Sequence, residues 1–275
     1  MRSAEHAGAV EFIERSLHTD LRLDRIAAHT GYSPYHLHRS FTRTFGLTPH
    51  AYVRRRRLTE AARALVNTSE PVLGIALRHG FGGQQSFTHA FSSHYGISPA
   101  AWRRAKRFFP LLMPYRFDAS EWELCRRGPG HLEITDRAGS DLLLPLSLAA
   151  VDMLPALDPH RHTTALRQKL DARHVVLAHH EGQDAAAMIV HPATGHIEYL
   201  AVHPLLRTSS ILSALVESAA RDYPRLSVTT FREGDRADLG HRRALLALGF
   251  RPAPLRVEFG YPTQLLELEP SGASQ

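Results

Sequence analysis

The stretch GYSPYHLHRSFTRTFG, residues Gly31–Gly46, recurs in altered form about fifty residues later as GFGGQQSFTHAFSSHYG, residues Gly80–Gly96. Apolar side chains stand four residues apart in both copies, which predicts a helix with one buried face. They are Leu37, Phe41 and Phe45 in the first copy and Phe87, Phe91 and Tyr95 in the second. The polar positions differ between the copies, so the repeat keeps a fold and changes a surface.

The repeat continues on both sides of these stretches. Ile26 aligns with Ile75 at an offset of 49, and Pro49 aligns with Pro99 at an offset of 50. One extra residue in the second copy, at Gly82–Gly83, accounts for the difference. Short first helices are expected at 22–29 and 72–79, so each copy has the form helix, tight turn, helix.

The ends of these helices carry the residues that usually mark them. Gly31 and Gly80 would close the first helices in a left-handed conformation. Ser33–Pro34 opens the second helix of the first copy, because serine can cap free backbone N–H groups and proline suits the first helical position. The same pair recurs as Thr48–Pro49 and Ser98–Pro99. The pattern predicts two helix-turn-helix motifs, each able to place its second helix in a DNA major groove.

A longer helix is expected between the two copies, from about Pro49 to Val66. It carries four consecutive arginines, Arg54 to Arg57, which point around the helix and so cannot all contact one partner. Some of them are expected to reach phosphates. A stiff helix of this kind could hold two recognition helices about one DNA turn apart, ~34 Å.

Charge is divided unevenly along the 275 residues. Residues 1–114 hold 16 Lys and Arg against 7 Asp and Glu, a net charge of +9, whereas residues 115–275 have a net charge of −3. The basic half is a candidate for binding a polyanion. A basic solvated surface, or two exposed helices in an unrelated bundle, are the alternatives.

The remaining composition limits the class of protein. No apolar run approaches the ~20 residues of a membrane span, and a single cysteine, Cys125, excludes an intrachain disulfide. We therefore expect a cytoplasmic protein with no membrane partner. The stretch RFFPLLMPYRFD, residues 107–118, marks a packed seam between two domains.

Residues 7–107 resemble the DNA-binding domain of the AraC/XylS family, particularly its MarA and Rob subgroup. The resemblance rests on IAAHTGYSPYHLHRSFTRTFGLTPHAYVRRRRL and IALRHGFGGQQSFTHAFSSHYGISPAAWR. It implies seven helices, binding to double-stranded promoter DNA and recruitment of RNA polymerase. Base-reading residues carried over by position are Tyr35, His38, Arg39, Gln84, Gln85, Thr88 and His89. Phosphate contacts are expected from Ser33, Arg43, Arg54, Arg55, Gly83, Ser86 and Arg104. Histidine at 38 and 89 departs from the more usual Gln or Arg.

The second half alternates strands and helices from about His131. Strands are expected in HLEIT, HVVLAHHEG, AAAMIVHP, GHIEYLAVHP, LSVTTF and RVEFGYPTQLLELE, with a tight turn at Glu181–Gly182. Helices are expected at 140–157, at about 160–170, in SSILSALVESAARDY and in DLGHRRALLALGF. This order predicts an α/β layer fold.

The second half also resembles the GNAT acetyltransferase fold, through IEYLAVHPLLRTSSILSALVESA and RRALLALGF. That family binds acyl-CoA at a turn of pattern Arg/Gln-x-x-Gly-x-Gly/Ala, which aligns here with Arg207, Ser210 and Leu212. A leucine at 212 obstructs close approach of the pyrophosphate to backbone N–H groups. Leu245 stands where the family often has a tyrosine acid. Glu198 could be a general base, although a solvated carboxylate is the commoner role for such a residue.

Together these observations predict a multi-domain chain. An all-α helix-turn-helix domain is expected at 1–109, a linker at 110–130 and a GNAT-like domain at 131–270. The second domain is expected to be non-catalytic and either to sense a ligand or to mediate protein contacts. A small-molecule effector would bind in a cleft formed by Glu198, Val202, Arg207 and Ser210. The alternative is an active N-acetyltransferase that uses acetyl-CoA. We expect no metal, because His160, His162, His179 and His180 lack accompanying Cys, Asp or Glu ligands at a suitable spacing.

Overall fold

The computed structural model divides the chain into two compact units, Met1–Arg126 and Arg127–Gln275, which we describe separately. It describes residues 2–119, 121–122, 132–135, 150–153, 155–156, 174–180, 183–207, 209–258 and 260–269. No helix in these ranges is long and apolar enough to cross a membrane.

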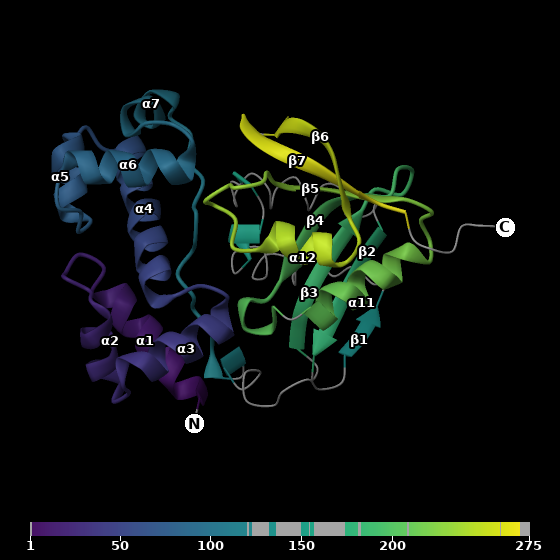
Figure 1. The fold of residues 1–275 in the computed structure, drawn as a ribbon, viewed down its shortest axis with the longest axis horizontal. Coiled ribbons are helices and arrows are strands. Elements are labelled where there is room, and N and C mark those ends of the chain that lie inside the picture. The colour runs from purple at the N-terminus through teal and green to yellow at the C-terminus, as the bar shows by residue number, and fades with distance from the viewer. Residues whose placement is uncertain are drawn as a thin grey trace. The chain divides into compact units, whose positions relative to one another are not determined.

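The first unit is helical. Its helices are α1 (Arg2–Arg15), α2 (Leu23–Thr30), α3 (Pro34–Phe45), α4 (Pro49–Asn67), α5 (Val72–Arg78), α6 (Gln84–Tyr95) and α7 (Pro99–Ala105). Figure 1 shows α1, α2 and α3 at one end of α4, and α5, α6 and α7 at the other. The two predicted copies, α2–α3 and α5–α6, are therefore joined by one long helix.

The predicted helix ends are confirmed. The hydroxyls of Ser33, Thr48 and Ser98 each accept a hydrogen bond from the backbone N–H three residues on, at 3.1–3.2 Å. Gly31 and Gly80 have φ of 74° and 72°, the left-handed conformation that stops each first helix. The α6 N-terminus differs from that of α3, because Gly83 precedes it and offers no side-chain cap.

Two aromatic clusters form the cores of the copies, and the predicted buried face is confirmed at all six positions. Leu37, Phe41, Phe45, Phe87, Phe91 and Tyr95 are each at most 3% exposed. Tyr52 of α4 packs edge-on against Phe41, and Trp102 of α7 packs edge-on against Phe91. The repeated sequence thus builds the same core twice at opposite ends of α4.

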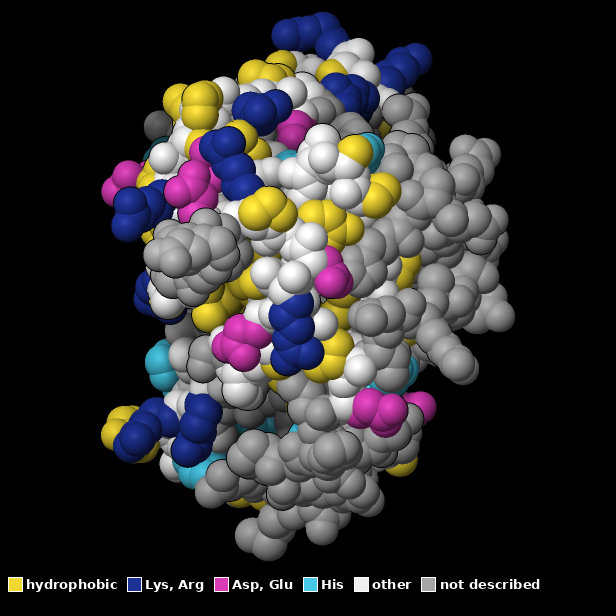
Figure 2. All heavy atoms as spheres, turned by 90° about the vertical axis from the view of Figure 1, so that its right-hand side faces the viewer, with side chains coloured by type: hydrophobic (Ala, Val, Ile, Leu, Met, Phe, Trp, Pro, Cys, Tyr) yellow, Lys and Arg dark blue, Asp and Glu magenta, His cyan; other side chains and the backbone are white. Residues whose placement is uncertain are grey.

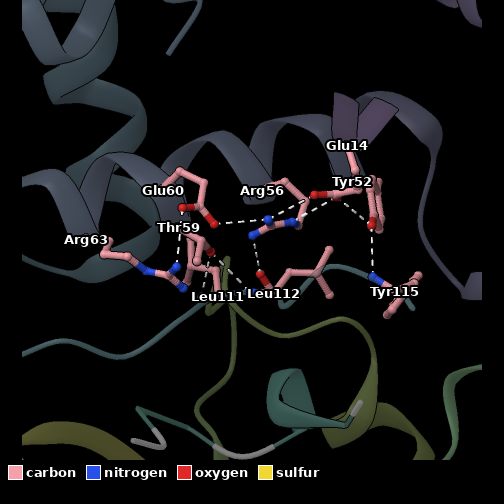
Figure 3. A network of polar contacts seen from close by, with 9 residues as sticks. All are labelled: Glu14, Tyr52, Arg56, Thr59, Glu60, Arg63, Leu111, Leu112 and Tyr115. Atoms are coloured by element: carbon pink, nitrogen blue, oxygen red, sulfur yellow. Dashed lines mark hydrogen bonds and ion pairs between the residues drawn. The ribbon is translucent and has the colours of Figure 1, made fainter. Parts of the chain in front are cut away.

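A buried polar network crosses the first unit between α1, α4 and the segment after α7 (Figure 3). The Arg56 guanidinium forms two bonds with the Glu14 carboxylate, at 2.9 and 3.0 Å, and a third with Glu60 at 3.0 Å. The Tyr52 hydroxyl donates to Glu14 at 2.8 Å, and burial together with Glu14 raises the pKa of Tyr52 well above its ordinary value. Arg56 also donates to the Leu112 carbonyl. This network fixes α1 against α4.

The segment after α7 packs on α4 instead of leading away from it. The backbone N–H groups of Leu111 and Leu112 both donate to the Thr59 hydroxyl, and that of Tyr115 donates to Tyr52. Leu111, Leu112 and Tyr115 are all buried. The expected linker at 110–130 therefore begins with residues that belong to the first unit; 123–130 lie outside the described residues.

The described residues of the second unit form a seven-stranded mixed sheet of order β1-β2-β3-β4-β5-β7-β6. The strands are β1 (Leu132–Thr135), β2 (His174–His180), β3 (Gln183–Val190), β4 (His196–Val202), β5 (Leu226–Phe231), β6 (Arg251–Glu258) and β7 (Tyr261–Leu268). All neighbours are antiparallel except β4 and β5, which pair in parallel at two positions only.

Helices cover parts of this sheet. Helix α11 (Ser209–Ala220) packs on β1, β2 and β3, and α12 (His241–Ala247) packs beside β5. The predicted inward face of α11 is confirmed, since Ile211, Leu212, Leu215, Val216 and Ala219 are all buried. Short 3-10 turns η1 (Val151–Met153) and η3 (Pro204–Leu206) follow β1 and β4 in the chain.

The expected strand and helix positions from His174 onward agree with the structure, except that β6 begins at Arg251, five residues before the expected segment RVEFGYPTQLLELE. The helix expected at 140–157 does not hold in its described part, where 151–153 form a 3-10 turn. The rest of that helix, apart from Ala150, Pro155 and Ala156, lies outside the described residues, as do the helix at 160–170 and the turn at Glu181–Gly182.

Candidate nucleic-acid interface

Helix α3 presents three of the predicted base-reading side chains on one exposed face. Tyr35, His38 and Arg39 are exposed, Tyr35 by 70%. The Arg39 guanidinium donates to the Tyr35 hydroxyl at 3.0 Å and lies 5.4 Å from the centre of its ring. Arg39 is thus held near one orientation while its remaining N–H groups stay accessible to a planar acceptor.

Helix α6 presents the second predicted set. Gln84, Gln85 and His89 are exposed, and Thr88 is half-buried. Among the described residues, none of these four side chains has a hydrogen bond or ion pair. Their amide, hydroxyl and imidazole groups are therefore available to an external partner.

A groove lies between the two copies, and α4 forms its floor. His38 of α3 and Ser86 of α6 line its sides, and His50 and Arg54 of α4 line the floor. The sequence interpretation did not include His50. Its position directly after Pro49 in the first turn of α4 was the available signal, because that turn follows the first copy without a break.

Arg54, on this floor, has an unmet need for a partner. Its Nε is buried and has no hydrogen-bond partner, and its guanidinium makes no ion pair among the described residues. A buried charged donor without an acceptor is costly, by ~1–3 kcal/mol or more. An anionic oxygen in the groove could pair with the guanidinium charge through its terminal N–H groups.

The four arginines of α4 have different roles, and the expectation for one of them is wrong. Arg55 is only 6% exposed, so it is not presented to a phosphate on the surface. Arg56 makes its hydrogen bonds within the buried network described above. Arg57 donates to the backbone carbonyls of Leu17 and Thr19, at 2.8 and 2.5 Å, and braces the start of the first copy. Arg54 and Arg57 both line the groove, and of these two Arg54 has no hydrogen bond or ion pair among the described residues.

The other predicted phosphate contacts lie at the surface of the first unit. Arg43 and Arg104 are exposed, at the end of α3 and in α7. Ser33 and Ser86 are exposed at the N-termini of α3 and α6, where Ser86 donates to the Gly83 carbonyl at 3.0 Å. A Cβ at Gly83 would meet nothing within 4 Å, so the fold itself does not require glycine there. Uncapped N–H groups at such a helix start are suited to an anion.

The predicted cleft in the second unit is not assembled as expected. Glu198 lines a cavity between β4 and β5. Val202 is buried at 2% exposure, with its N–H directed at the Met153 sulfur, and it does not line that cavity. Arg207 is bound to the Asp152 carboxylate by two bonds of 2.6 and 2.7 Å, and Ser210 is exposed on α11. Of these four residues, only Glu198 lines this cavity in the described part of the chain.

These contacts do not fit an acyl-CoA diphosphate. Arg207, which would meet the diphosphate in the GNAT pattern, is held by Asp152, whose side chain is completely buried. Burial would raise the pKa of Asp152, but the Arg207 charge and hydrogen bonds hold it well below its usual range. Leu212 and Leu245 are both buried and line the cavity with apolar surface.

In the described ranges, no group of three His, Cys, Asp or Glu is arranged to hold a metal ion, and His160 and His162 lie outside those ranges. On the face shown in Figure 2, the described Lys and Arg side chains are interspersed with Asp, Glu and hydrophobic ones.

Comparison with known proteins places the matched family model in the first unit. A family model described as "Helix-turn-helix domain" matches residues 26–105. The HTH-type transcriptional activator AarP of Providencia stuartii is 45% identical over 92 residues, which cover 34% of this chain and 68% of AarP. MarA of Salmonella typhimurium is 35% identical over 94 residues, or 34% of this chain and 74% of MarA. The Right origin-binding protein of Escherichia coli is 44% identical over 107 residues, and only 37% of its length is covered.

Two solved structures also resemble parts of this chain. An AraC-type DNA-binding protein from Chromobacterium violaceum has a TM-score of 0.36 at 29% identity, covering 37% of this chain and 91% of its own. A putative GNAT-family acetyltransferase from Desulfovibrio desulfuricans has a TM-score of 0.41 at 19% identity, covering 50% of this chain and 99% of its own.

The repeated core and the exposed helices α3 and α6 point to the same family as the relatives do. AarP and MarA are matched over 68% and 74% of their own lengths, at 45% and 35% identity. The chain belongs to the AraC family of helix-turn-helix DNA-binding transcription regulators.

Proposed function

We propose that this regulator reads an asymmetric promoter site as a single chain, with α3 in one major-groove segment and α6 in the next. Helix α4 has 19 residues and is therefore about 28 Å long at 1.5 Å per residue. That length suits two helices held near one DNA turn apart, ~34 Å. The observation that carries the proposal is Arg54, which lines the groove between the copies and makes no ion pair among the described residues.

The proposed base contacts follow from side-chain chemistry. Arg39 can bridge guanine O6 and N7, Gln84 and Gln85 can pair with adenine, and Thr88 can touch a thymine methyl. Tyr35, His38 and His89 would complete the two faces. Because α3 and α6 carry different residues, the two halves of the operator should differ in sequence.

The remaining contacts would fix the position of the protein on DNA without reading sequence. Phosphates would be bound by Arg54, Arg43 and Arg104, by the hydroxyls of Ser33 and Ser86, and by the N–H groups that follow Gly83. His50 is added to this set because it lines the same groove.

Substitutions on the recognition helices test the proposed reading. Arg39→Ala and Gln85→Ala should each weaken operator binding by ~1–3 kcal/mol and relax specificity at one position. Arg15→Ala, on the exposed surface of α1, is the matched control and should leave affinity unchanged. Fluorescence anisotropy with operator and random duplexes measures both effects. Unchanged operator affinity in both variants would exclude these helices as the readers.

Arg54 has a separate test, because a phosphate contact has a different signature. Arg54→Gln should weaken binding to operator and random DNA equally, and should reduce the slope of log K against log salt by about 1. A loss confined to the operator would instead make Arg54 a base reader.

The biological setting follows from promoter binding. By similarity to AarP, whose name describes a transcriptional activator, we propose activation through contact with RNA polymerase, in the cytoplasm where promoter DNA is found. Transcription in vitro from a promoter that carries the operator, with and without the protein, tests this role.

For the second unit we propose a ligand-sensing role without acetyl transfer. The Arg207–Asp152 pair and the apolar Leu212 and Leu245 support this, because they occupy positions that a GNAT enzyme uses for cofactor and acid. The alternative is a bifunctional regulator with N-acetyltransferase activity. Calorimetry with acetyl-CoA distinguishes them: binding with detectable acetyl transfer to an amine would support the alternative.

A further inference from the structure

Tyr35 is an exposed aromatic side chain in the first turn of α3. It is 70% exposed, more than any other large hydrophobic residue that the structure describes in the first unit. Burial in the core therefore does not explain an aromatic ring at this position. The backbone beneath it is fixed, because Pro34 opens the helix and the Ser33 hydroxyl accepts a hydrogen bond from the His36 N–H at 3.2 Å.

The phenol of Tyr35 contacts Arg39, which stands one helical turn later on the same face. The Arg39 Nη1 donates a hydrogen bond to the Tyr35 hydroxyl at 3.0 Å, and the guanidinium carbon lies over the ring, 5.4 Å from its centre. A cation at that distance from an aromatic face is attracted to it. In the described part of the chain, the Arg39 side chain makes no ion pair and no other hydrogen bond. Two interactions with one residue thus set the direction of its guanidinium.

The nitrogen that Tyr35 holds determines which edge of the guanidinium is left for DNA. A guanidinium carries five N–H groups in one plane, and those of Nε and Nη2 lie parallel along one edge. The bond to Tyr35 engages Nη1, so both N–H groups of that edge remain accessible. Two parallel donors match the O6 and N7 acceptors of guanine in the major groove. The contact with Tyr35 therefore leaves Arg39 with the pair of donors that a guanine requires.

The second copy does not repeat this arrangement. At the offset of 50 residues, Gln85 and His89 of α6 stand where Tyr35 and Arg39 stand in α3. Both are exposed, and among the described residues they share no hydrogen bond or ring contact. Fixing a long flexible side chain on a base costs conformational entropy, and a side chain that is already held loses less. This orientation before binding is therefore a feature of the α3 copy.

We propose that Tyr35 is a positioning residue, whose hydroxyl holds Arg39 in the orientation that reads guanine. This role replaces a base contact by Tyr35 itself, and it rests on the DNA reading by α3 proposed above. It also assigns the stronger guanine discrimination to the half of the operator that α3 occupies. A direct contact between the Tyr35 hydroxyl and DNA, and a purely structural role, are the alternatives.

A double-mutant cycle on the full chain tests the coupling between the two residues. The probe is a duplex that the unchanged protein selects from random-sequence DNA, and fluorescence anisotropy gives its dissociation constant. Tyr35→Phe keeps the ring and removes the hydroxyl, so it should weaken binding about threefold to tenfold, as expected for one hydrogen bond. In an Arg39→Ala background the same substitution should have no effect. In a His38→Ala background, which changes an exposed neighbour not bonded to Tyr35, its effect should persist in full.

A guanine analogue gives a readout that a structural role of Tyr35 would not change. 7-Deazaguanine lacks the N7 acceptor, and it replaces each guanine of the selected duplex in turn. The position at which it weakens binding of the unchanged protein, but not of Arg39→Ala, marks the base that Arg39 reads. At that position the loss should be about threefold smaller in Tyr35→Phe than in the unchanged protein. Thermal unfolding of Tyr35→Phe should match that of the unchanged protein, because the hydroxyl is exposed.

The positioning role and the proposed DNA reading fail in different ways. An effect of Tyr35→Phe that disappears without Arg39, together with the smaller 7-deazaguanine loss, supports the positioning role. An equal effect with and without Arg39 would show that Tyr35 contacts DNA directly, and unchanged affinity in Tyr35→Phe would show that its hydroxyl has no role. Either result overturns the positioning role alone, provided that Arg39→Ala weakens binding. Unchanged affinity in Arg39→Ala would overturn both proposals.

Discussion

Gly80 and Gly31 occupy the same place in the two copies but meet different surroundings. Both have left-handed φ values, 72° and 74°. A Cβ at Gly31 would meet nothing within 4 Å, whereas a Cβ at Gly80 would lie 2.6 Å from the Arg57 guanidinium carbon. Glycine at 80 therefore serves both the turn and the close approach of an arginine that braces Leu17 and Thr19.

Alanine at the two positions should consequently have different costs. Gly31→Ala should lower the free energy of unfolding by about 1 kcal/mol, the cost of a left-handed alanine. Gly80→Ala should lower it by about 3 kcal/mol, because Arg57 must also give up hydrogen bonds made by a charged donor. Urea unfolding measures both. In an Arg57→Ala background the two costs should become equal; a persistent difference would contradict this account.

His79 should make stability depend on pH. Burial, with His18 beside it, lowers the pKa of His79 to about 4, and its Nε2 has no hydrogen-bond partner. The unfolded state binds a proton near pH 6.5 and the folded state only near pH 4, so stability is lost as pH falls through that window. Glu60 opposes the shift, whereas Arg78 and Arg57 add to it.

His79→Gln removes this titrating group. Between pH 7 and pH 5 the unchanged protein should lose ~2 kcal/mol more unfolding free energy than the variant. Urea titrations at the two pH values give the difference. His89→Gln, an exposed change on α6, should keep the original pH dependence, and an identical dependence in His79→Gln would contradict the assignment.

At the scale of elements, α1 is held to α4 by the Glu14–Arg56 pair, in which Arg56 is 4% exposed and Glu14 20%. Removing one member of a buried pair leaves the other charge poorly compensated. Glu14→Gln should therefore lower the free energy of unfolding by about 2–4 kcal/mol. Glu11→Gln breaks an exposed pair with Arg15 on the same helix and should change it by at most ~0.5 kcal/mol. Similar losses in both variants would mean that the buried pair has no special role.

The helices of the first unit could be predicted because their signals are local. Ser33, Thr48 and Ser98 cap helices through residues three positions away, and the core positions follow a spacing of four. The burial and the partners of the four arginines could not be predicted, because they depend on residues that are distant in the sequence. Arg56 is buried and pairs with Glu14, which lies 42 residues earlier in the sequence. Arg54, only two residues away from Arg56, lines the groove instead.

The same limit applies to the second unit. Strand positions could be predicted from apolar runs bounded by turns, such as LSVTTF for β5. No local sequence pattern indicates that Arg207 pairs with Asp152, which lies 55 residues away. This pair removes Arg207 from the expected cleft. The cavity between β4 and β5 likewise depends on where their ladder stops, which follows from packing of the whole sheet.

At the scale of the whole molecule, the boundary between the units lies beyond the predicted end of the DNA-binding domain at 109. Leu111, Leu112 and Tyr115 are buried and bonded to Thr59 and Tyr52 of α4. A chain cut after 109 would lose these contacts and expose the apolar surface beneath them. Each buried leucine alone contributes about 1.5–3 kcal/mol. The segment is therefore part of the DNA-binding unit and not a tether.

Two fragments test this boundary. Residues 1–126 should fold cooperatively and bind the operator with the affinity of the full chain, because they contain the whole first unit. Residues 1–109 should be destabilised by several kcal/mol, since two leucines and Tyr115 are lost together with their hydrogen bonds. Thermal unfolding followed by circular dichroism, together with anisotropy on the operator, compares them. Equal stability of the two fragments would show that the segment after α7 only connects the units, and the boundary at 109 would stand.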